Sequence, residues 1–328
     1  MATSTCPLAN SQYYLMLADE SVWGTSGDTW YHLPVNSYGV RFRPTSRQAK
    51  PKVGLLQGKH FSNTKGFVAG QIDTYLYGLG AGASTSVSLM EKLLTWGFGE
   101  SETICTASKT AEWGIAGTDY GNKKHLGLRC DSITVRGSED QDAISVMLNV
   151  MGQNESSTTF EMEALPSDMD GITEVEFTNV DFYIGNDSGS LALLPIRAFA
   201  IQRNRGLKEH YLGSNRPTYL GSTTNETSVV IAPLKLDRDN DVLLRTLGSQ
   251  EQYGRFIFKG AHVGSITTTA PGGGASTLAV AQVDIPRMSL VNKEDSDDRE
   301  GFTFEQLQWS ALKPDTTDNS VVLAYSVE

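Results

Sequence analysis

The sequence lacks the surplus of positive charge with which proteins hold nucleic acid by its phosphates. Among 328 residues, 27 are Lys or Arg and 38 are Asp or Glu, which gives a formal net charge of −11. Phosphate neutralisation requires an excess of basic side chains, so firm binding of nucleic acid is not expected from the chain as a whole. The charge agrees with ordinary solubility, and also with a protein past which DNA slides without adhering.

Cysteine is scarce, and long apolar runs are absent. Cys6, Cys105 and Cys130 are odd in number and far apart, so they form neither a disulfide framework nor a CxxC metal site. No run approaches the roughly 18 consecutive apolar residues of a membrane span. Residues 1–10 lack the basic and apolar segments of a secretory signal. We therefore expect an intracellular protein with reduced thiols and no membrane association.

Motifs for catalysis, cofactors and metals are missing as well. The five histidines, His32, His60, His125, His210 and His262, show neither HxH nor HExxH spacing, and no GxSxG, Walker or kinase motif occurs. Residues 78–83 fit GxGxxA, but the segment before them alternates and no second βα unit follows. This context favours a loop over a dinucleotide site. We predict that the protein is not an enzyme and holds no cofactor or metal.

What the sequence does contain is one pattern twice, and a length of 328 residues already suggests two domains. Residues 33–40 (LPVNSYGV) align with 194–201 (LPIRAFAI) at an offset of 161. Short helices are expected at 89–96, closed by Gly97, and at 242–247, with paired leucines 150 positions apart. Hairpins with period-two alternation follow near 133–150 and 288–309, offset by 155. Three matches in the same order predict a tandem duplication.

The predicted fold is mainly β. Two tandem copies of one unit occupy 1–155 and 172–328, joined by a linker at 156–171. Each copy begins with a strand at the Leu-Pro pair, continues into a long arm at 43–65 or 203–221, and returns in a second strand. A short helix, further strands and the terminal hairpin complete it. The alternation indicates antiparallel sheets with one buried and one wet face.

Charge is arranged alike in both halves. Seven basic residues and no acidic residue lie between Arg41 and Lys65, and a weaker basic run follows the first strand of the second half. Acidic clusters without calcium-loop spacing fall at the expected hairpin tips, 137–142 and 292–301. Their members are Glu139, Asp140, Asp142, Glu294, Asp295, Asp297 and Asp298. We expect solvated or intersubunit tips rather than metal sites, and a β-bulge near Glu305 and Gln306, where the alternation changes phase.

Three roles are open for the two basic arms. They could bind nucleic acid, although only Phe42 and Phe61 are available there for stacking. They could be solvated loops, or they could dock on an acidic surface of another copy. Head-to-tail docking of unlike surfaces produces an open filament. The candidate contact residues are Arg41, Arg43, Arg47, Lys50, Lys52, Arg203 and Arg205.

The chain resembles the tail tube proteins (major tail proteins) of long-tailed, non-contractile, siphovirus-type bacteriophages. The resemblance rests on residues 20–25 (ESVWGT) with 33–35 (LPV), 130–135 (CDSITV) with 144–150 (ISVMLNV), 194–201 (LPIRAFAI) and 307–312 (LQWSAL). It covers nearly the whole chain as a pattern of strands and loops. It implies β-sandwich or barrel units, each with a flanking helix, whose hairpins join those of neighbours into a barrel around a channel. Long loops then reach the adjacent ring.

The resemblance further implies a structural virion protein, made in the host bacterial cytoplasm and located in the tail. Two units per chain imply trimeric, pseudo-hexameric rings that stack into a tube for genome passage. Implied partners are other copies of the chain, tape-measure protein and double-stranded DNA transiently in the lumen, and tail terminator and distal tail proteins at the ends. The inner-barrel role falls on strands that contain Ile133, Val135, Ile144, Val146, Leu148, Met288, Leu290, Phe302 and Phe304.

Two other functions stay open. A β-sandwich could bind carbohydrate through exposed tryptophans, although the expected lack of a signal peptide and of disulfides argues against it. The chain could also be another tail or baseplate component.

Overall fold

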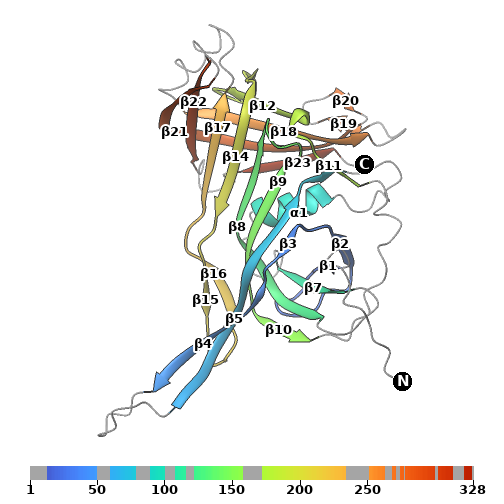
Figure 1. Cartoon of the computed structure of the whole chain (residues 1–328), viewed down its shortest axis with the longest axis vertical. Helices are drawn as coiled ribbons and strands as arrows, with labels where there is room; N and C mark the ends of the chain where they lie inside the picture. The colour runs from blue at the N-terminus through green and yellow to red at the C-terminus, as the bar shows by residue number, and fades with distance from the viewer. Residues whose placement is uncertain are drawn as a thin grey trace.

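The structure is a computed structural model, and it describes residues 13–49, 60–78, 89–99, 108–115, 122–157, 172–233, 251–262, 268–270, 274–276, 278–299, 302–312 and 321–326. Within these residues the chain is mainly β, which confirms the predicted class (Figure 1). The expected glycine-rich loop beyond Gly78 and the second helix at 242–247 lie outside the described residues.

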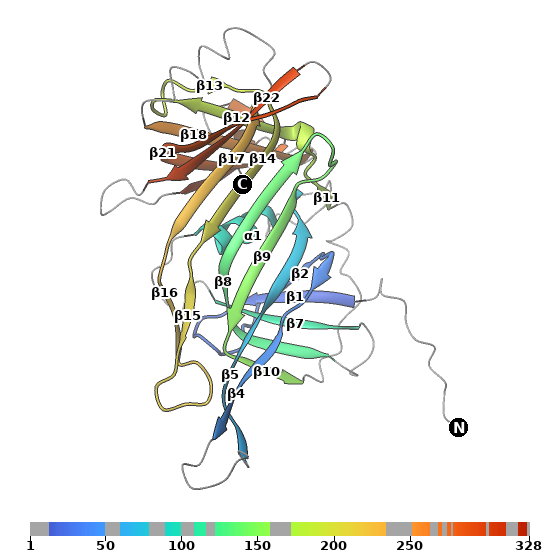
Figure 2. The ribbon, with the colours of Figure 1, turned by 60° about the vertical axis from the view of Figure 1, so that its left-hand side comes forward.

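One antiparallel sheet runs through both halves of the chain. Its strands in spatial order are β4 (Arg41–Ala49), β5 (His60–Tyr75), β9 (Ser145–Gly152), β8 (Lys123–Ser138), β14 (Ile196–Asn204), β17 (Glu226–Pro233), β22 (Phe302–Ala311) and β21 (Leu278–Arg299). The short strand β3 (Ser37–Tyr38) precedes β4 on the same side of β5. The halves meet where β8 pairs with β14, from Ser138 opposite Ala198 to Ser132 opposite Asn204. Both views show the central strands side by side (Figures 1 and 2).

A smaller group of strands joins this sheet in each half. In the first half, β1 (Tyr13–Asp19) pairs with β2 (Trp30–Leu33) and β7 (Lys109–Ile115), and β8 pairs with β7 and β10 (Asn154–Ser157). In the second half, β12 (Val180–Gly185) pairs with β13 (Ala192–Leu193) and β18 (Gln252–His262), and β21 pairs with β18 and β23 (Val322–Ser326). These pairings recur in the same order along the chain in both halves.

Three short pairs and one turn of 3₁₀-helix complete the described elements. They are β6 (Tyr77–Gly78) with β11 (Thr173–Glu174), β15 (Leu207–His210) with β16 (Tyr219–Ser222), β19 (Thr268–Ala270) with β20 (Gly274–Ser276), and η3 (Phe177–Asn179). Strand β10 extends to Ser157, two residues into the predicted linker, and residues 158–171 lie outside the described residues.

The alternation of apolar and polar residues in the sequence matches the alternating burial of side chains along the strands. In β9, Val146, Leu148 and Val150 are at most 1% exposed, whereas the residues between them are half-buried. Ile72 of β5 and Ile133 of β8 join the same core. Side chains of a strand point to opposite faces in turn, so one face of the central sheet packs inward and the other stays open.

The one helix of the described chain, α1 (Leu89–Phe98), lies against the inner face of β8 (Figure 1). The expected helix closed at Gly97, but α1 continues through this glycine to Phe98. A Cβ atom at Gly97 would lie 2.1 Å from Cδ1 of Ile133. Glycine is therefore present here for close packing of the helix on the sheet rather than for helix termination.

The second terminal hairpin corrects two predictions. Strand β21 continues to Arg299 and pairs with β22, so the acidic run at 294–298 lies in a paired strand and not in a long hairpin tip. The register shifts between Leu290 and Asn292 and again between Asp295 and Asp298, both on β21, whereas a bulge was expected near Glu305 and Gln306 on the opposite strand. Only backbone pairing reveals on which strand an extra residue lies.

Candidate functional site

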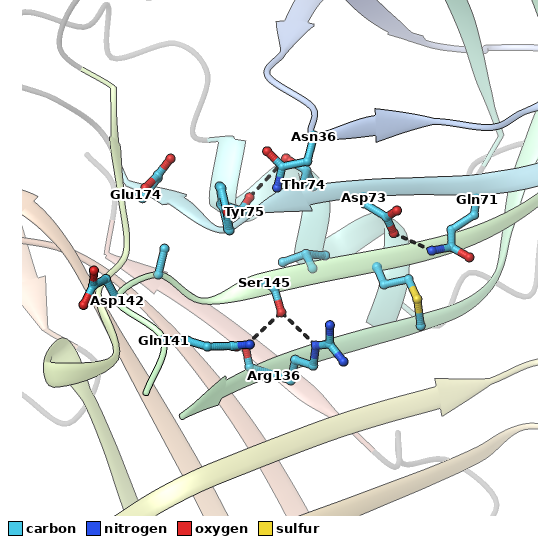
Figure 3. Close-up of a pocket in the computed structure, with 13 residues that line it drawn as sticks. Asn36, Gln71, Asp73, Thr74, Tyr75, Arg136, Gln141, Asp142, Ser145 and Glu174 are labelled. Atoms are coloured by element: carbon cyan, nitrogen blue, oxygen red, sulfur yellow. Dashed lines mark hydrogen bonds between the residues drawn. The ribbon is translucent and has the colours of Figure 1, made fainter. Parts of the chain in front are cut away.

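The open face of the central sheet contains a groove of about 590 Å³ (Figure 3). Polar side chains of β5, β8 and β9 line it, and they bind one another. The Gln71 amide donates to the Asp73 carboxylate at 2.6 Å, and the Ser37 hydroxyl donates to it at 2.5 Å. Arg136 donates through Nε to the Ser145 hydroxyl at 3.1 Å. The lining residues that the structure describes include the carboxylates of Asp73, Asp142 and Glu174 but no His or Cys.

The same face continues across the second half with small and uncharged side chains. Its members include Ala198, Ala200, Gln202, Ser228, Val230, Ala232, Gln308 and Ser310, all of them half-buried or exposed. A second hollow of about 260 Å³ is lined by residues of β8, β14 and β17, with β14 between the other two strands. The side chains named here are therefore mostly small and uncharged, in contrast to the polar and charged groove of the first half.

Two arms extend from the sheet and contact each other. The first is the β4–β5 hairpin and the second the β15–β16 hairpin, and both project to the same side (Figures 1 and 2). The Gly66 amide donates to the Asn215 carbonyl at 3.1 Å. The Arg216 guanidinium lies 4.2 Å from the centre of the Phe42 ring. Cation–π contacts of this kind are worth about 0.5–1 kcal/mol at exposed sites. We call the paired hairpins the composite arm.

The predicted arm residues fall into two groups. Arg41 and Arg43 are exposed on β4, at the base of the composite arm. Arg47 belongs to β4, but its side chain lies outside the described residues, as do Lys50 and Lys52 entirely.

Arg203 and Arg205 were predicted to contact another ring, and the structure corrects their placement. Arg203 is 2% exposed, and it donates to the Phe98 carbonyl and, at 2.9 Å, to Asn225. Arg205 donates to the carbonyls of Gly99 and, at 3.2 Å, of Cys130. The last carbonyls of a helix need donors, and cations favour that end of the helix dipole. Both arginines therefore serve the end of α1 inside the chain.

The first acidic tip connects the two halves. Glu139 forms an ion pair with Arg197, and its amide donates to the Arg197 carbonyl at 2.8 Å. Asp140 and Asp142 are exposed beside it. The side chains of Glu294, Asp295, Asp297 and Asp298 lie outside the described residues. The predicted inner-barrel residues Ile133, Val135, Ile144, Val146, Leu148 and Met288 are buried in the core, Leu290 is partly buried, and the side chains of Phe302 and Phe304 are not among those described.

A chain of polar contacts covers the outer edge of β4. The Phe42 amide points away from β5 and donates to Glu155 at 2.7 Å. Glu155 also binds Lys123 at 3.0 Å and His125 at 3.2 Å, and the other ring nitrogen of His125 lies 2.6 Å from the Tyr38 hydroxyl. No sequence motif predicted this cluster, because its members are spread over more than a hundred positions of the chain.

The electrostatics of the cluster follow from burial and hydrogen bonding. Burial by itself would raise the pKa of Glu155, but Lys123, the Phe42 amide and His125 together hold that pKa below its usual value. Burial lowers the pKa of His125 despite the nearby carboxylate. Burial also raises the pKa of Tyr38 well above 10. At neutral pH the edge is therefore covered by an anion, a neutral imidazole and a neutral phenol.

In comparison with known proteins, no family model matches the chain and no curated protein matches its sequence. Within the described ranges, no helix has the length and apolar character needed to cross a membrane. In the same part of the chain, no group of three or more His, Cys, Asp and Glu residues is placed to hold a metal ion.

Proposed function

We propose that the chain polymerises as stacked rings into the tail tube of a long-tailed, non-contractile bacteriophage, and that the tube conducts the genome. The pairing of β8 with β14 carries this proposal. Through it, two four-stranded groups with the same strand order join edge to edge. Repetition of the same step between chains would extend the sheet around a ring.

Strand register supports the proposed tandem duplication. Leu148 lies opposite Ile72, and Leu307 lies opposite Ile231, so both second-half residues follow their counterparts by 159 positions. The register shifts around residues 131 and 291 are likewise 160 positions apart. These offsets revise the 155 inferred from hairpin alignment, because paired positions and not loop lengths define equivalence.

The two ends of the central sheet support growth of the assembly. In the described chain, β4 pairs only with β5, and β21 beyond Met288 pairs only with β22. Unpaired strand edges favour association with another chain. Joining β21 of one copy to β3 and β4 of the next would close a barrel without edges. Three chains would supply six units and produce the trimeric, pseudo-hexameric ring.

The open face of the sheet is the proposed channel wall, since α1 and the smaller strand groups cover the other face. In the second half its side chains are mostly small and uncharged, and in the first half the acids Asp73, Asp142 and Glu174 accompany Arg136, the one base among the described residues that line the groove. This face would therefore offer DNA few basic contacts, and phosphate contacts are what make proteins adhere to DNA. The acidic residues of β21 at 294–298 would add negative charge to the ring. A net positive lumen in the assembled tube would overturn this part of the proposal.

The composite arm is the proposed contact between rings. It projects past the sheet and presents Arg41, Arg43 and Lys65 as exposed cations. Docking of this arm on an acidic surface of the next ring is heterologous, and heterologous contacts that do not close make filaments. Tape-measure protein and DNA would then occupy the lumen in turn, with terminator and distal tail proteins at the two ends.

Electron microscopy of the purified full chain tests the proposal. Stacked rings with a central pore and three chains per ring are expected. Six chains per ring would contradict the tandem arrangement. Discrete monomers at all accessible protein concentrations would overturn the tube, and monomers that bind carbohydrate would favour the alternative β-sandwich lectin.

A further inference from the structure

The junction between the halves has a distinctive contact at the bulge of β8. Asp131 is the extra residue there, because Cys130 lies opposite Val150 and Ser132 lies opposite Asn149. Its carbonyl accepts the Arg205 amide at 2.8 Å, and its carboxylate accepts the Leu207 amide at 2.6 Å. One bulged residue thus satisfies two amides of the adjoining strand as that strand leaves the sheet.

The corresponding bulge of β21 holds a different residue. Leu290 lies opposite Trp309 and Asn292 lies opposite Gln308, so Val291 is the extra residue. Val291 is 64% exposed and belongs to the few large apolar side chains on the described surface. A valine in this place offers no carboxylate to a neighbouring amide, but it offers apolar area to a neighbouring apolar side chain.

The β3–β4 edge, which would meet this bulge in the ring, also differs from its counterpart in the second half: it lacks a backbone amide hydrogen at the corresponding position. Ser37 lies opposite Asp73 on β5, as Ala198 lies opposite Ala232 on β17. Ser37 therefore corresponds to Ala198, which follows it by 161 positions. At the same spacing, Pro44 corresponds to Arg205. Proline has no amide hydrogen, so it could not donate the bond that Arg205 donates to Asp131. Pro44 is exposed on β4.

We propose that Val291 of one copy packs against Pro44 of the next copy, and that this apolar contact identifies the junction between chains. The inference rests on the proposed ring. A mismatch is unfavourable in both directions. Asp131 opposite Pro44 would leave the Asp131 backbone carbonyl without its amide donor, and Val291 opposite Arg205 and Leu207 would leave the Leu207 amide without an acceptor. Specificity of this kind depends on penalties for the wrong partner as much as on attraction to the right one.

The consequence is a fixed alternation of the two units. Strand β8 accepts only β14 of its own chain, and β21 accepts only the β3–β4 edge of another chain. A second copy of this chain, in one register, is therefore the partner for which the edge is built.

Cysteine cross-linking tests the contact directly. The chain carries Pro44→Cys and Val291→Cys in a background with Cys6→Ser and Cys105→Ser, and Val22→Cys replaces Val291→Cys in the matched control. Val22 is 57% exposed, lies between β1 and β2, and belongs to neither strand of the proposed junction. Under mild oxidation of assembled protein, we expect covalent dimers and trimers from the first variant and at least roughly tenfold fewer from the control, because a disulfide needs Cα atoms within about 7 Å. Equal cross-linking in both, or none in assembled rings, would overturn the contact.

A substitution measures its strength. Val291→Asp introduces the residue that β8 carries, and it should raise the protein concentration needed for rings by roughly tenfold or more, which is the factor that corresponds to losing one buried valine contact. Val22→Asp should leave that concentration unchanged, and circular dichroism shows whether either chain folds. If the wild type forms rings and Val291→Asp forms them equally well, only this contact is refuted. If the wild type forms no rings at all, the proposed function fails first.

Discussion

Strands β4 and β14 occupy corresponding places in the two halves, but in the described chain β14 has a strand paired on its outer edge and β4 does not. β14 is paired with β8 along Ala198 to Asn204. β4 meets the Glu155 carboxylate at Phe42 and then reaches Pro44, which has no amide to offer. Natural sheets protect unpaired edges with charges and proline. The comparison teaches that the outer backbone groups of a strand can be satisfied by a paired strand, or by side chains until a partner strand binds.

The largest expected effect is the loss of stability on replacing the buried Arg203 of β14, compared with an exposed arginine of β4. Arg203 follows Phe42 by 161 positions, but it is buried and donates to the end of α1. Arg203→Ala should lower the free energy of unfolding by about 3 kcal/mol, because buried carbonyls lose a charged donor. Urea denaturation measures this, with the exposed Arg43→Ala as the control, for which a change within about 0.5 kcal/mol is expected. Similar losses in both variants would show that Arg203 has no special structural role.

A smaller effect concerns the covering of β4 and its response to acid. Glu155 has a folded-state pKa below its usual 4.5, so its contribution to stability is present above that value and is lost as pH falls through the folded-state pKa. His125 has a pKa below its usual 6.5, so stability also declines as pH falls below 6.5 and the unfolded chain takes up a proton. The melting temperature should therefore fall steadily from neutral pH to pH values near 4.

Glu155→Gln should cost about 1 kcal/mol at pH 7 and abolish the part of the pH dependence that lies below about pH 4.5. Melting curves from neutral pH to about pH 3, with the exposed Glu226→Gln on β17 as a control, decide the matter. The Phe42 amide should also exchange its hydrogen faster in the variant. An unchanged pH slope and unchanged exchange would mean that Glu155 does not cover the edge.

The smallest effect concerns the arms themselves. Arg216→Ala removes the contact with the Phe42 ring and should lower stability by less than about 1 kcal/mol. The β4–β5 hairpin and the β15–β16 hairpin should then move apart, which a pair of fluorescent labels on the two hairpins would report. Arg216→Lys should restore part of the contact. No change in label distance would indicate that the Gly66–Asn215 hydrogen bond and the Lys65–Tyr211 contact suffice to join the arms.

Much of the fold could be predicted because its signals are local. Alternation at 144–150 announced a strand with Val146, Leu148 and Val150 on one face, and the structure buries those three. The helix near 89–96 was also evident from its capping and apolar residues. Its true end at Phe98 was not, because Gly97 is required by contact with Ile133, a residue 36 positions away.

The candidate site could be predicted only in part. Arg41 and Arg203 look equivalent in sequence, since both follow the first strand of their half within a basic run. Arg41 is exposed, and Arg203 is buried against α1. A run of basic residues predicts that each side chain contacts solvent or an acidic group. It does not predict which backbone carbonyls the fold will place within hydrogen-bonding distance of a given arginine. The cluster of Tyr38, His125 and Glu155 had no sequence signal for the same reason.

By itself, the sequence determined the β class, the period-two faces of the strands and the recurrence of a pattern in both halves, because each depends on the order of residues along a short stretch. The tertiary structure decided which edges are paired, which are covered and which arginines are interior. Those outcomes depend on strands such as β8 and β14, which contribute neighbouring backbones from positions more than fifty residues apart. Hydrogen bonding across such distances is a property of the assembled sheet.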